Sequence, residues 1–182
     1  MKRQEQRKED TWCLEDLYEN EDLFSRDAER LDELMEQFAG LQGTLKEGAE
    51  ALIKVMKLYE EMNQIFEKLY VYANQRNHED TANAKYQKMS GETQLIAAKL
   101  NQVTSWLEPE ILALDEAMIK QSMEQMPELQ KYDWFLQQII RKKAHILDHE
   151  KEELLARVGE LAQTFNEMLS DLQLYIKNLS EI

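Results

Sequence analysis

The chain has 182 residues, enough to bury a hydrophobic core, and its 43% hydrophobic content is too high for a disordered protein. A net charge of −14 argues against nucleic acid as a partner, because phosphates would be repelled, and no apolar run reaches the length of a membrane span. Only five glycines and two prolines interrupt the sequence, so long helices are expected. The composition predicts an all-α protein.

The single cysteine, Cys13, excludes an internal disulfide and suits a reducing compartment. The first ten residues, MKRQEQRKED, are charged, and no apolar segment follows them, so they do not resemble a secretory signal. We therefore expect a cytoplasmic protein, with a flexible tail over residues 1–10 and a single helical domain over residues 11–182.

The segment Thr11–Tyr18 has apolar residues without a long helical repeat, and we expect it to form an arm that lies across the bundle and buries Trp12. A first helix is predicted to begin around Asn20–Asp22 and to end at Gly40 in a left-handed C-cap. Leu41–Gly48 is predicted to be a loop whose glycines can adopt positive φ. The inner face of the helix is expected to consist of Phe24, Ala28, Leu31, Met35 and Phe38, and the loop glycines are Gly43 and Gly48.

The stretch Ala49–Asn77 has a clear helical period. Its apolar residues repeat by threes and fours, and a second row lies beside the first at intervals of seven residues. Two adjacent rows form a stripe too wide for one partner, so this helix is expected to contact at least two neighbours. The first row is Leu52, Val55, Tyr59, Met62, Phe66, Leu69 and Ala73, and the second is Ala51, Leu58, Ile65 and Tyr72.

A helix of matching period is predicted over Ala82–Leu107, with its N-terminus capped by Asp80 or Thr81. Because few residues separate it from the preceding helix, the two are expected to form an antiparallel hairpin. Gly91 lies in the middle of this helix and weakens it, which favours a close crossing with another backbone there. The inward row is Tyr86, Met89, Thr93, Ile96, Leu100, Val103 and Leu107.

Three further helical segments are predicted after this hairpin. Pro109–Leu114 is expected to form one short turn, and Asp115 is expected to cap a helix through Met126. Another helix is predicted over Pro127–Ala144. Its inward residues are expected to be Leu129, Tyr132, Leu136, Ile139 and Ile140.

A last helix is predicted to follow Asp148. It carries a double apolar stripe like that of Ala49–Asn77, so we expect these two helices to be direct partners. The predicted fold is an antiparallel bundle of about five to six helices, several of them long, with a short N-terminal arm.

His145 and His149 are four residues apart, the spacing of two zinc ligands on one helix turn. A zinc-peptidase helix also needs a glutamate directly after the first histidine, and Ile146 occupies that position. We therefore expect both to be polar residues at a helix start, and His78, beside Glu79, to lie in a surface loop.

Other candidate groups also receive structural interpretations. Cys13 lacks a histidine partner for thiol catalysis, and Glu60, Glu61 and the run Glu150–Glu153 fit solvated helix faces. Tyr70 lies off both apolar rows and could line a cleft, although packing between helices is the interpretation that we favour. The residues therefore predict no catalytic, cofactor-binding or metal-binding site.

A series of short landmarks spans roughly residues 11–168. It consists of Trp12, Leu14 and Asp16-Leu17-Tyr18; Phe38 and Gly43-Thr44-Leu45; Leu69-Tyr70-Val71-Tyr72-Ala73; Asp80-Thr81-Ala82-Asn83 and Tyr86; Ser105-Trp106-Leu107-Glu108-Pro109-Glu110-Ile111-Leu112; Pro127-Glu128-Leu129, Tyr132, Arg141 and Lys143; and His145-Ile146-Leu147 with Glu152-Glu153-Leu154-Leu155. In this order the series resembles the N-terminal region of the oligoendopeptidase F family, zinc metallopeptidases related to thimet oligopeptidase.

The resemblance implies that full-length relatives hydrolyse oligopeptides with zinc held by an HExxH motif and a later glutamate, in a larger domain that this chain does not contain. No residue here matches a catalytic or zinc-binding position, so the resemblance assigns no site residue and no cofactor to this chain. It implies a helical lobe beside the active-site channel, with the catalytic domain as its partner and oligopeptides as the substrate of the parent enzyme.

A second interpretation stays open. The chain also fits a stand-alone helical module that self-associates or binds a partner helix, because a missing domain would leave the stripe of the last helix partly exposed. Ser170–Ile182 departs from the family pattern, which leaves a piece of a longer enzyme, the reading we favour, or a short separate product. Peptide length preference, cleavage specificity, oligomeric state and the face that lines the channel are not indicated by the sequence.

Overall fold

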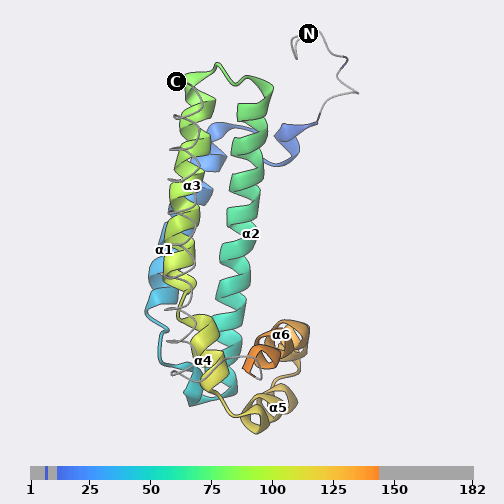
Figure 1. Cartoon of the computed structure of the whole chain (residues 1–182). Helices are drawn as coiled ribbons and strands as arrows, with labels where there is room; N and C mark the ends of the chain where they lie inside the picture. Colours follow the sequence, from blue (N-terminus) through green and yellow to red (C-terminus); the bar gives the residue numbers. More distant parts are fainter. Residues whose placement is uncertain (1–6, 8–11, 144–182) are drawn as a thin grey trace, which may run out of the picture. The chain divides into compact units, whose positions relative to one another are not determined.

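The computed structural model describes residue 7 and residues 12–143 (Figure 1). Most of the predicted tail and the whole of the predicted last helix lie outside these residues. The chain divides into two units, Met1–Ile140 and Arg141–Ile182, and the description below concerns the first. The elements in order are η3 (Leu14–Asp16), α1 (Glu21–Ala39), η4 (Leu45–Glu47), α2 (Ala49–Glu79), α3 (Ala84–Thr104), α4 (Leu107–Ala113), α5 (Glu116–Gln125), η5 (Pro127–Tyr132) and α6 (Asp133–Lys143).

Every regular element in the described residues is helical, which confirms the all-α prediction. α1, α2 and α3 run side by side, and α2 is antiparallel to both of its neighbours (Figure 1). α4, α5 and α6 gather at the end of the bundle where α2 begins (Figure 1). None of the described helices is long and apolar enough to cross a lipid bilayer.

α1 begins where the sequence predicted, because Asn20 caps it. The Oδ1 atom of Asn20 accepts a hydrogen bond of 3.1 Å from the backbone N–H of Leu23. The predicted left-handed cap at Gly40 is wrong, since Gly40 has φ −68° and the chain continues through further right-handed turns. Positive φ values occur instead at the two loop glycines, Gly43 (86°) and Gly48 (120°), as predicted. Of the predicted inner face, Phe24, Leu31, Met35 and Phe38 are buried and Ala28 is partly buried.

α2 extends two residues beyond the predicted end and packs against α1 and α3, which confirms the expectation of at least two neighbours. Most of the first apolar row is fully buried, and Tyr72 is the buried member of the second row. Ile53 and Met56 are also buried, at 7% and 1% exposure, because the first turns of α2 are covered by η4, α5 and η5 as well. The beginning of α2 is therefore enclosed on more sides than its end.

The hairpin of α2 and α3 forms as predicted, but its cap is different. Asn83 caps α3 by accepting hydrogen bonds from the backbone N–H groups of Lys85 and Tyr86. Asp80 instead accepts from Ala82 within the connecting turn, so the prediction of Asp80 or Thr81 as the cap is wrong. The reason is that α2 continues to Glu79, which moves the turn and the next helix start forward.

The predicted close crossing at Gly91 is also wrong. A Cβ atom added to Gly91 would meet no atom within 4 Å, so the residue faces open space. The inward row of α3 passes through Met89, Thr93 and Leu100, all buried, and Gly91 lies off that row. The glycine therefore weakens the helix without allowing any closer packing.

The segments after α3 are helical as predicted, but one of the predicted helices is split into two elements. Asp115 caps α5 by accepting a hydrogen bond of 3.0 Å from the backbone N–H of Ala117, as predicted. The short helix expected over Pro109–Leu114 starts two residues earlier, at Leu107. The helix expected from Pro127 is divided into η5 and α6. Its predicted inward residues Leu129, Tyr132, Leu136 and Ile139 are buried, and Ile140 is partly buried.

The N-terminal arm packs on the bundle through different residues than predicted. Trp12 is 77% exposed, so the expectation that the arm buries it is wrong. Leu14 and Tyr18 are buried instead, at 2% and 1% exposure. The turn of η3 brings these two residues to one side, with the Tyr18 N–H donating to the Leu14 carbonyl at 3.1 Å, whereas Trp12 precedes the turn.

Candidate functional surface

Potential metal ligands do not converge in the part of the chain that the structure describes, where no three His, Cys, Asp or Glu side chains form a group. His78 lies in the last turn of α2 and is exposed, so the prediction that it lies in a loop is wrong. The other two histidines, His145 and His149, lie outside the described residues.

Cys13 has an environment that suppresses thiol reactivity. Its Sγ atom is exposed and donates a hydrogen bond of 3.3 Å to Oδ1 of Asp16. This contact raises the pKa of Cys13, because the carboxylate stabilises the thiol form and repels the thiolate. The contact therefore favours the protonated thiol of Cys13 over the thiolate.

The arm is held on α2 by a cluster of aromatic rings. The ring of Tyr18 meets those of Phe24 and Tyr72 edge-on, with centroids 5.6 and 5.2 Å apart. The Tyr18 hydroxyl donates a hydrogen bond of 2.8 Å to Asp27, and the ammonium of Lys68 lies 4.1 Å from the Tyr18 ring centroid. Burial and the Asp27 carboxylate raise the pKa of Tyr18. These contacts fix the arm and α1 to the end of α2.

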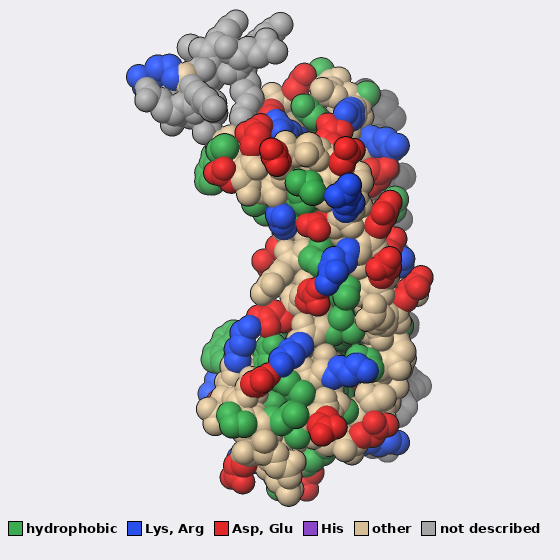
Figure 2. All heavy atoms as spheres, turned by 180° about the vertical axis from the view of Figure 1, so that it is seen from behind, with side chains coloured by type: hydrophobic (Ala, Val, Ile, Leu, Met, Phe, Trp, Pro, Cys, Tyr) green, Lys and Arg blue, Asp and Glu red, His purple; other side chains and the backbone are tan. Residues whose placement is uncertain are grey.

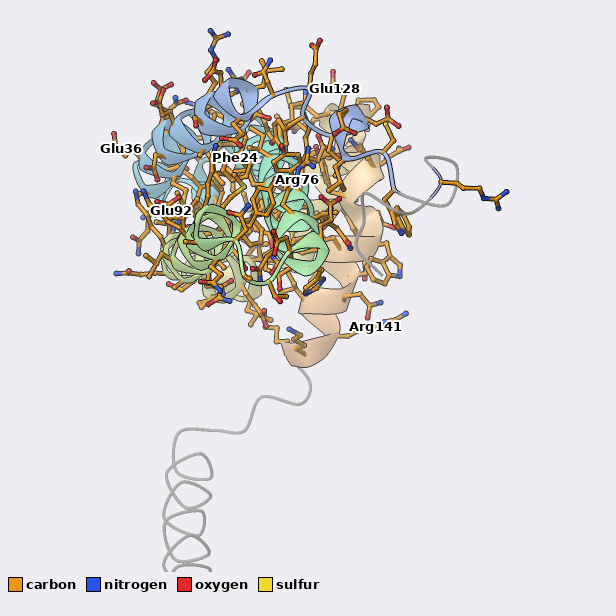
Figure 3. The ribbon with its side chains drawn as sticks, turned by 90° about the horizontal axis from the view of Figure 1, so that it is seen from above. Phe24, Glu36, Arg76, Glu92, Glu128 and Arg141 are labelled. Carbon is orange, nitrogen blue, oxygen red and sulfur yellow. The ribbon has the colours of Figure 1, made fainter. Side chains whose placement is uncertain are left out.

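Arg76 belongs to the same cluster. Its guanidinium lies 3.0 Å from Glu15 in the arm and 3.2 Å from Glu79, and it stacks over the ring of Tyr72 at 5.2 Å. Figure 3 looks along the bundle and shows Arg76 and Phe24 inside the helices, whereas Glu36 lies at the edge. The positive charge of Arg76 is therefore directed inward.

A second set of contacts fixes η5 and α6 to the first half of α2. Glu60 accepts hydrogen bonds from the Tyr132 hydroxyl, at 2.7 Å, and from the Lys131 ammonium. Those two donors hold the pKa of Glu60 below its usual range, and burial followed by Glu60 raises the pKa of Tyr132 to about 12. The ring of Tyr59 also packs on Phe135, 5.6 Å between centroids. Glu60 thus joins two segments instead of facing solvent as predicted.

Opposite the ring cluster, the outer side of α2 is open. Its end carries several residues that are exposed or partly exposed and bear no formal charge, among them Tyr70, Val71, Asn74, Gln75 and His78. We call these five residues the uncharged strip. Tyr70 and Val71 are both 44% exposed. Figure 2 shows the surface hollowed along α2 between the arm and α6. The sequence raised two readings for Tyr70, and the structure shows an exposed ring that packs on Phe66 at 5.8 Å.

The comparisons with known proteins agree with one another. The family model described as Oligopeptidase F matches residues 110–174. The group B oligopeptidase PepB of Streptococcus agalactiae is 32% identical over 150 residues, which is 82% of this chain and 25% of that protein. The chain matches the N-terminal region of the oligoendopeptidase F family. The chain spans about a quarter of the length of the curated oligoendopeptidase F relatives that it matches.

Two solved structures have a similar fold. The crystal structure of oligoendopeptidase-F from Enterococcus faecium aligns with a TM-score of 0.64 and 33% identity, over 78% of this chain and 27% of that one. A putative peptidase from Chlamydophila abortus aligns with a TM-score of 0.68 at 24% identity, over 86% of this chain and 27% of that one, which shows a shared fold. The helical arrangement described above is therefore that of the oligoendopeptidase F N-terminal region.

The uncharged strip was not identified from the sequence. Tyr70 was conspicuous in the sequence by itself, and its neighbours were recognised as family landmarks. The signal that could have found the strip is composition, because the ten residues from Leu69 to His78 contain one formal charge in a chain where 32% of residues are charged. Which of those residues face outward required the structure, since it depends on where the arm and α3 cover α2.

Proposed function

We propose that this chain is a non-catalytic helical lobe of an oligoendopeptidase F-like zinc peptidase, and that it restricts access of peptides to a catalytic part made by other polypeptide. The observation that carries the proposal is the 32% identity to a quarter of an oligopeptidase, together with the TM-score of 0.64 to the crystal structure of an oligoendopeptidase F. The catalytic part would hold the zinc ion and activate water on it for attack on the peptide bond.

The way the helices are held together supports a role as a rigid barrier to substrate entry. α2 is fixed at two points, near its end by the ring cluster of Tyr18, Phe24 and Tyr72 and in its first half by the hydrogen bonds of Glu60 to η5. A lobe that excludes folded proteins from an active site must keep its conformation when a substrate contacts it. Restriction of access therefore suits a helix that is anchored at two points along its length and keeps one side of its end open.

The test removes the matching first quarter of the Streptococcus agalactiae oligopeptidase and supplies this chain in its place, mixed in excess. Cleavage of a short fluorogenic peptide and of an unfolded protein of over a hundred residues is then compared with and without the chain. We expect the chain to slow cleavage of the long substrate more than that of the short one. An unchanged ratio of the two rates would contradict the proposal.

A second measurement addresses the chain by itself. We expect a chelator-free preparation to contain no stoichiometric zinc and to cleave no peptide. One tightly bound zinc ion per chain, found by elemental analysis together with peptide hydrolysis, would show that the chain is itself an enzyme.

The alternative function is a stand-alone helical interaction module. Exposed large apolar residues on three different helices favour it: Tyr70 and Val71 on α2, Leu95 on α3 and Trp134 on α6. Light scattering separates the two functions in part, since a module that self-associates gives a dimer at low concentration. The reading frame downstream of the gene is a sharper test, because an HExxH motif within it would favour the peptidase lobe.

A further inference from the structure

We infer that the uncharged strip of α2 is the docking surface for the polypeptide that forms the rest of an oligoendopeptidase F-like enzyme. The inference rests on the proposed function and adds to it the surface through which the two parts meet. Three observations support it: the charge of the strip, its rigidity and the length of the relatives.

Charge distinguishes the strip from the outer face of α1. Between Leu69 and His78, the formal charge belongs to Arg76, and its guanidinium is directed to Glu15 and Glu79. The outer face of α1, by contrast, exposes Glu29, Glu33 and Glu36 as well as arginines. The centres of protein interfaces are depleted in charged residues and enriched in aromatic ones. The strip has this composition, and the outer face of α1 has that of a solvated helix.

The strip is also held rigid before any partner binds. The ring of Tyr70 packs on Phe66, and Asn74 donates a hydrogen bond of 2.8 Å to the Tyr70 carbonyl. Asn74 in turn accepts one of 3.0 Å from Ser90 on α3, which is 6% exposed. In the described part of the chain, the Tyr70 hydroxyl itself makes no hydrogen bond, so it can donate to a partner. A pre-ordered surface loses little conformational entropy when it binds.

The identity of the partner follows from length and charge. In the Enterococcus faecium crystal structure, the matched region is 27% of one longer chain, so it belongs there to a protein with nearly three times as much additional polypeptide. A second copy of the present chain is a weaker candidate, because two chains of net charge −14 repel each other. We therefore assign the strip to the remainder of the enzyme.

The experiment measures binding of the full chain to the Streptococcus agalactiae oligopeptidase that lacks its matching first quarter. The variant Tyr70→Glu/Val71→Lys places two charges in the strip. The control is Leu95→Glu, which charges a residue that is 73% exposed on α3. We expect the dissociation constant to rise about 30-fold or more for the double variant and less than about 3-fold for the control. Circular dichroism and size-exclusion chromatography verify that both variants fold.

The outcomes separate the two proposals. If the unmodified chain does not bind the truncated relative, the proposed function fails and the docking surface with it. If the chain binds but the double variant binds equally well, the docking surface is wrong and the proposed function stands. A dimer of the unmodified chain that the double variant abolishes would assign the strip to a second copy and overturn the inference.

Should the truncated relative be insoluble, the same substitutions are tested in a chimera in which this chain replaces its first quarter. There the double variant is expected to lower the melting temperature of the chimera by more than it lowers that of the separate chain, while Leu95→Glu shifts both equally. Equal shifts for both variants in both proteins would overturn the inference.

Discussion

The two ends of α2 use their outer surfaces in different ways. Near its beginning, charged side chains on α2 form contacts within the chain: Lys57 pairs with Glu128, and Glu60 joins Lys131 and Tyr132. Near its end, the charged side chain is turned inward, and the outer surface is left to the uncharged strip. One helix thus uses charged side chains on its outer side for contacts near its beginning and offers an uncharged outer surface near its end.

Substitution of an exposed residue should therefore have different consequences at the two ends of this helix. An outer position near the start of α2 is occupied by a partner from η5 or α6, so substituting it should affect folding. An outer position near the end has no partner among the described residues other than its own helix and α3, so substituting it should affect binding and leave folding unchanged. The predictions below test this separation, beginning with the largest effect.

Tyr72 and Tyr70 are two residues apart on α2 and face opposite ways. Tyr72 is 2% exposed and lies in the ring cluster with Tyr18 and Phe24, whereas Tyr70 is 44% exposed. Tyr72→Ala should lower the free energy of unfolding by about 3 to 5 kcal/mol, and Tyr70→Ala by about 0.5 kcal/mol or less. Urea denaturation followed by circular dichroism measures both. Equal losses would mean that the outer face at the end of α2 is as much a part of the core as the face that carries Tyr72.

Alkaline pH should weaken both anchors of α2. The pKa values of Tyr18 and Tyr132 are raised in the folded chain, so it keeps these two protons where the unfolded chain, with a pKa near 10, has lost them. The free energy of unfolding should therefore hold steady below about pH 10 and fall by about 1 kcal/mol per tyrosine by pH 11. Denaturation curves between pH 9 and pH 11 measure the fall.

The control for this prediction is the double variant Tyr18→Phe/Tyr132→Phe, which has no hydroxyl to ionise at either anchor. Its free energy of unfolding should depend less on pH over the same range. A pH dependence as steep as that of the unmodified chain would assign the alkaline loss to other groups.

The hydrogen bond between Tyr132 and Glu60 should contribute less to the free energy of unfolding at neutral pH than the burial of Tyr72 does. Tyr132→Phe removes the donor and leaves the ring, so we expect a loss of about 1 kcal/mol in the free energy of unfolding. Tyr86→Phe is the matched control, since the Tyr86 hydroxyl makes no hydrogen bond within the described part of the chain. Thermal denaturation of the two variants measures the difference. An equal loss of stability in both would show that the hydrogen bond to Glu60 does not stabilise this contact.

The smallest expected effect is a gain in stability. Gly91 lies in the middle of α3 with open space around it, so Gly91→Ala should raise the free energy of unfolding by about 0.5 to 1 kcal/mol. Gly48→Ala should do the reverse, because φ at Gly48 is 120° and a side chain is strained there whatever the space. Chemical denaturation resolves both changes. A loss on Gly91→Ala would indicate that another backbone approaches this point after all.

Most of the fold could be predicted because it depends on local patterns. The period of Ala49–Asn77 fixed a helix that the structure extends by two residues, and the caps at Asn20 and Asp115 lie where short polar side chains precede an apolar repeat. The wide stripe predicted more than one neighbour, and both α1 and α3 pack there. These features require no knowledge of distant residues.

The predictions were wrong where a distant residue, or another residue nearby in the sequence, determines the local structure. Trp12 is the largest side chain of the arm, but the turn that follows it selects Leu14 and Tyr18 for burial. Asp80, Thr81 and Asn83 can all cap a helix, and the length of α2 determines which one does. Gly91 was explained by a close crossing, yet its position on the outer side of α3 depends on where α2 lies.

The candidate surface was less predictable than the fold. Its composition is readable between Leu69 and His78, but two facts could not be read there. The inward direction of Arg76 depends on Glu15, which is 61 residues away in the chain, and the exposure of Val71 depends on the arm leaving that side of α2 open. Whether a residue is on the outer surface depends on which distant segments pack over it, and local sequence patterns carry little information about that.

Hydrogen–deuterium exchange on the full chain, with and without the Streptococcus agalactiae oligopeptidase that lacks its first quarter, tests the central claim most directly. The account predicts that added oligopeptidase slows exchange in peptides covering residues 69–79 of α2 and leaves peptides from the outer face of α1, residues 26–36, unchanged. Slower exchange over residues 26–36 with none over residues 69–79 would contradict it.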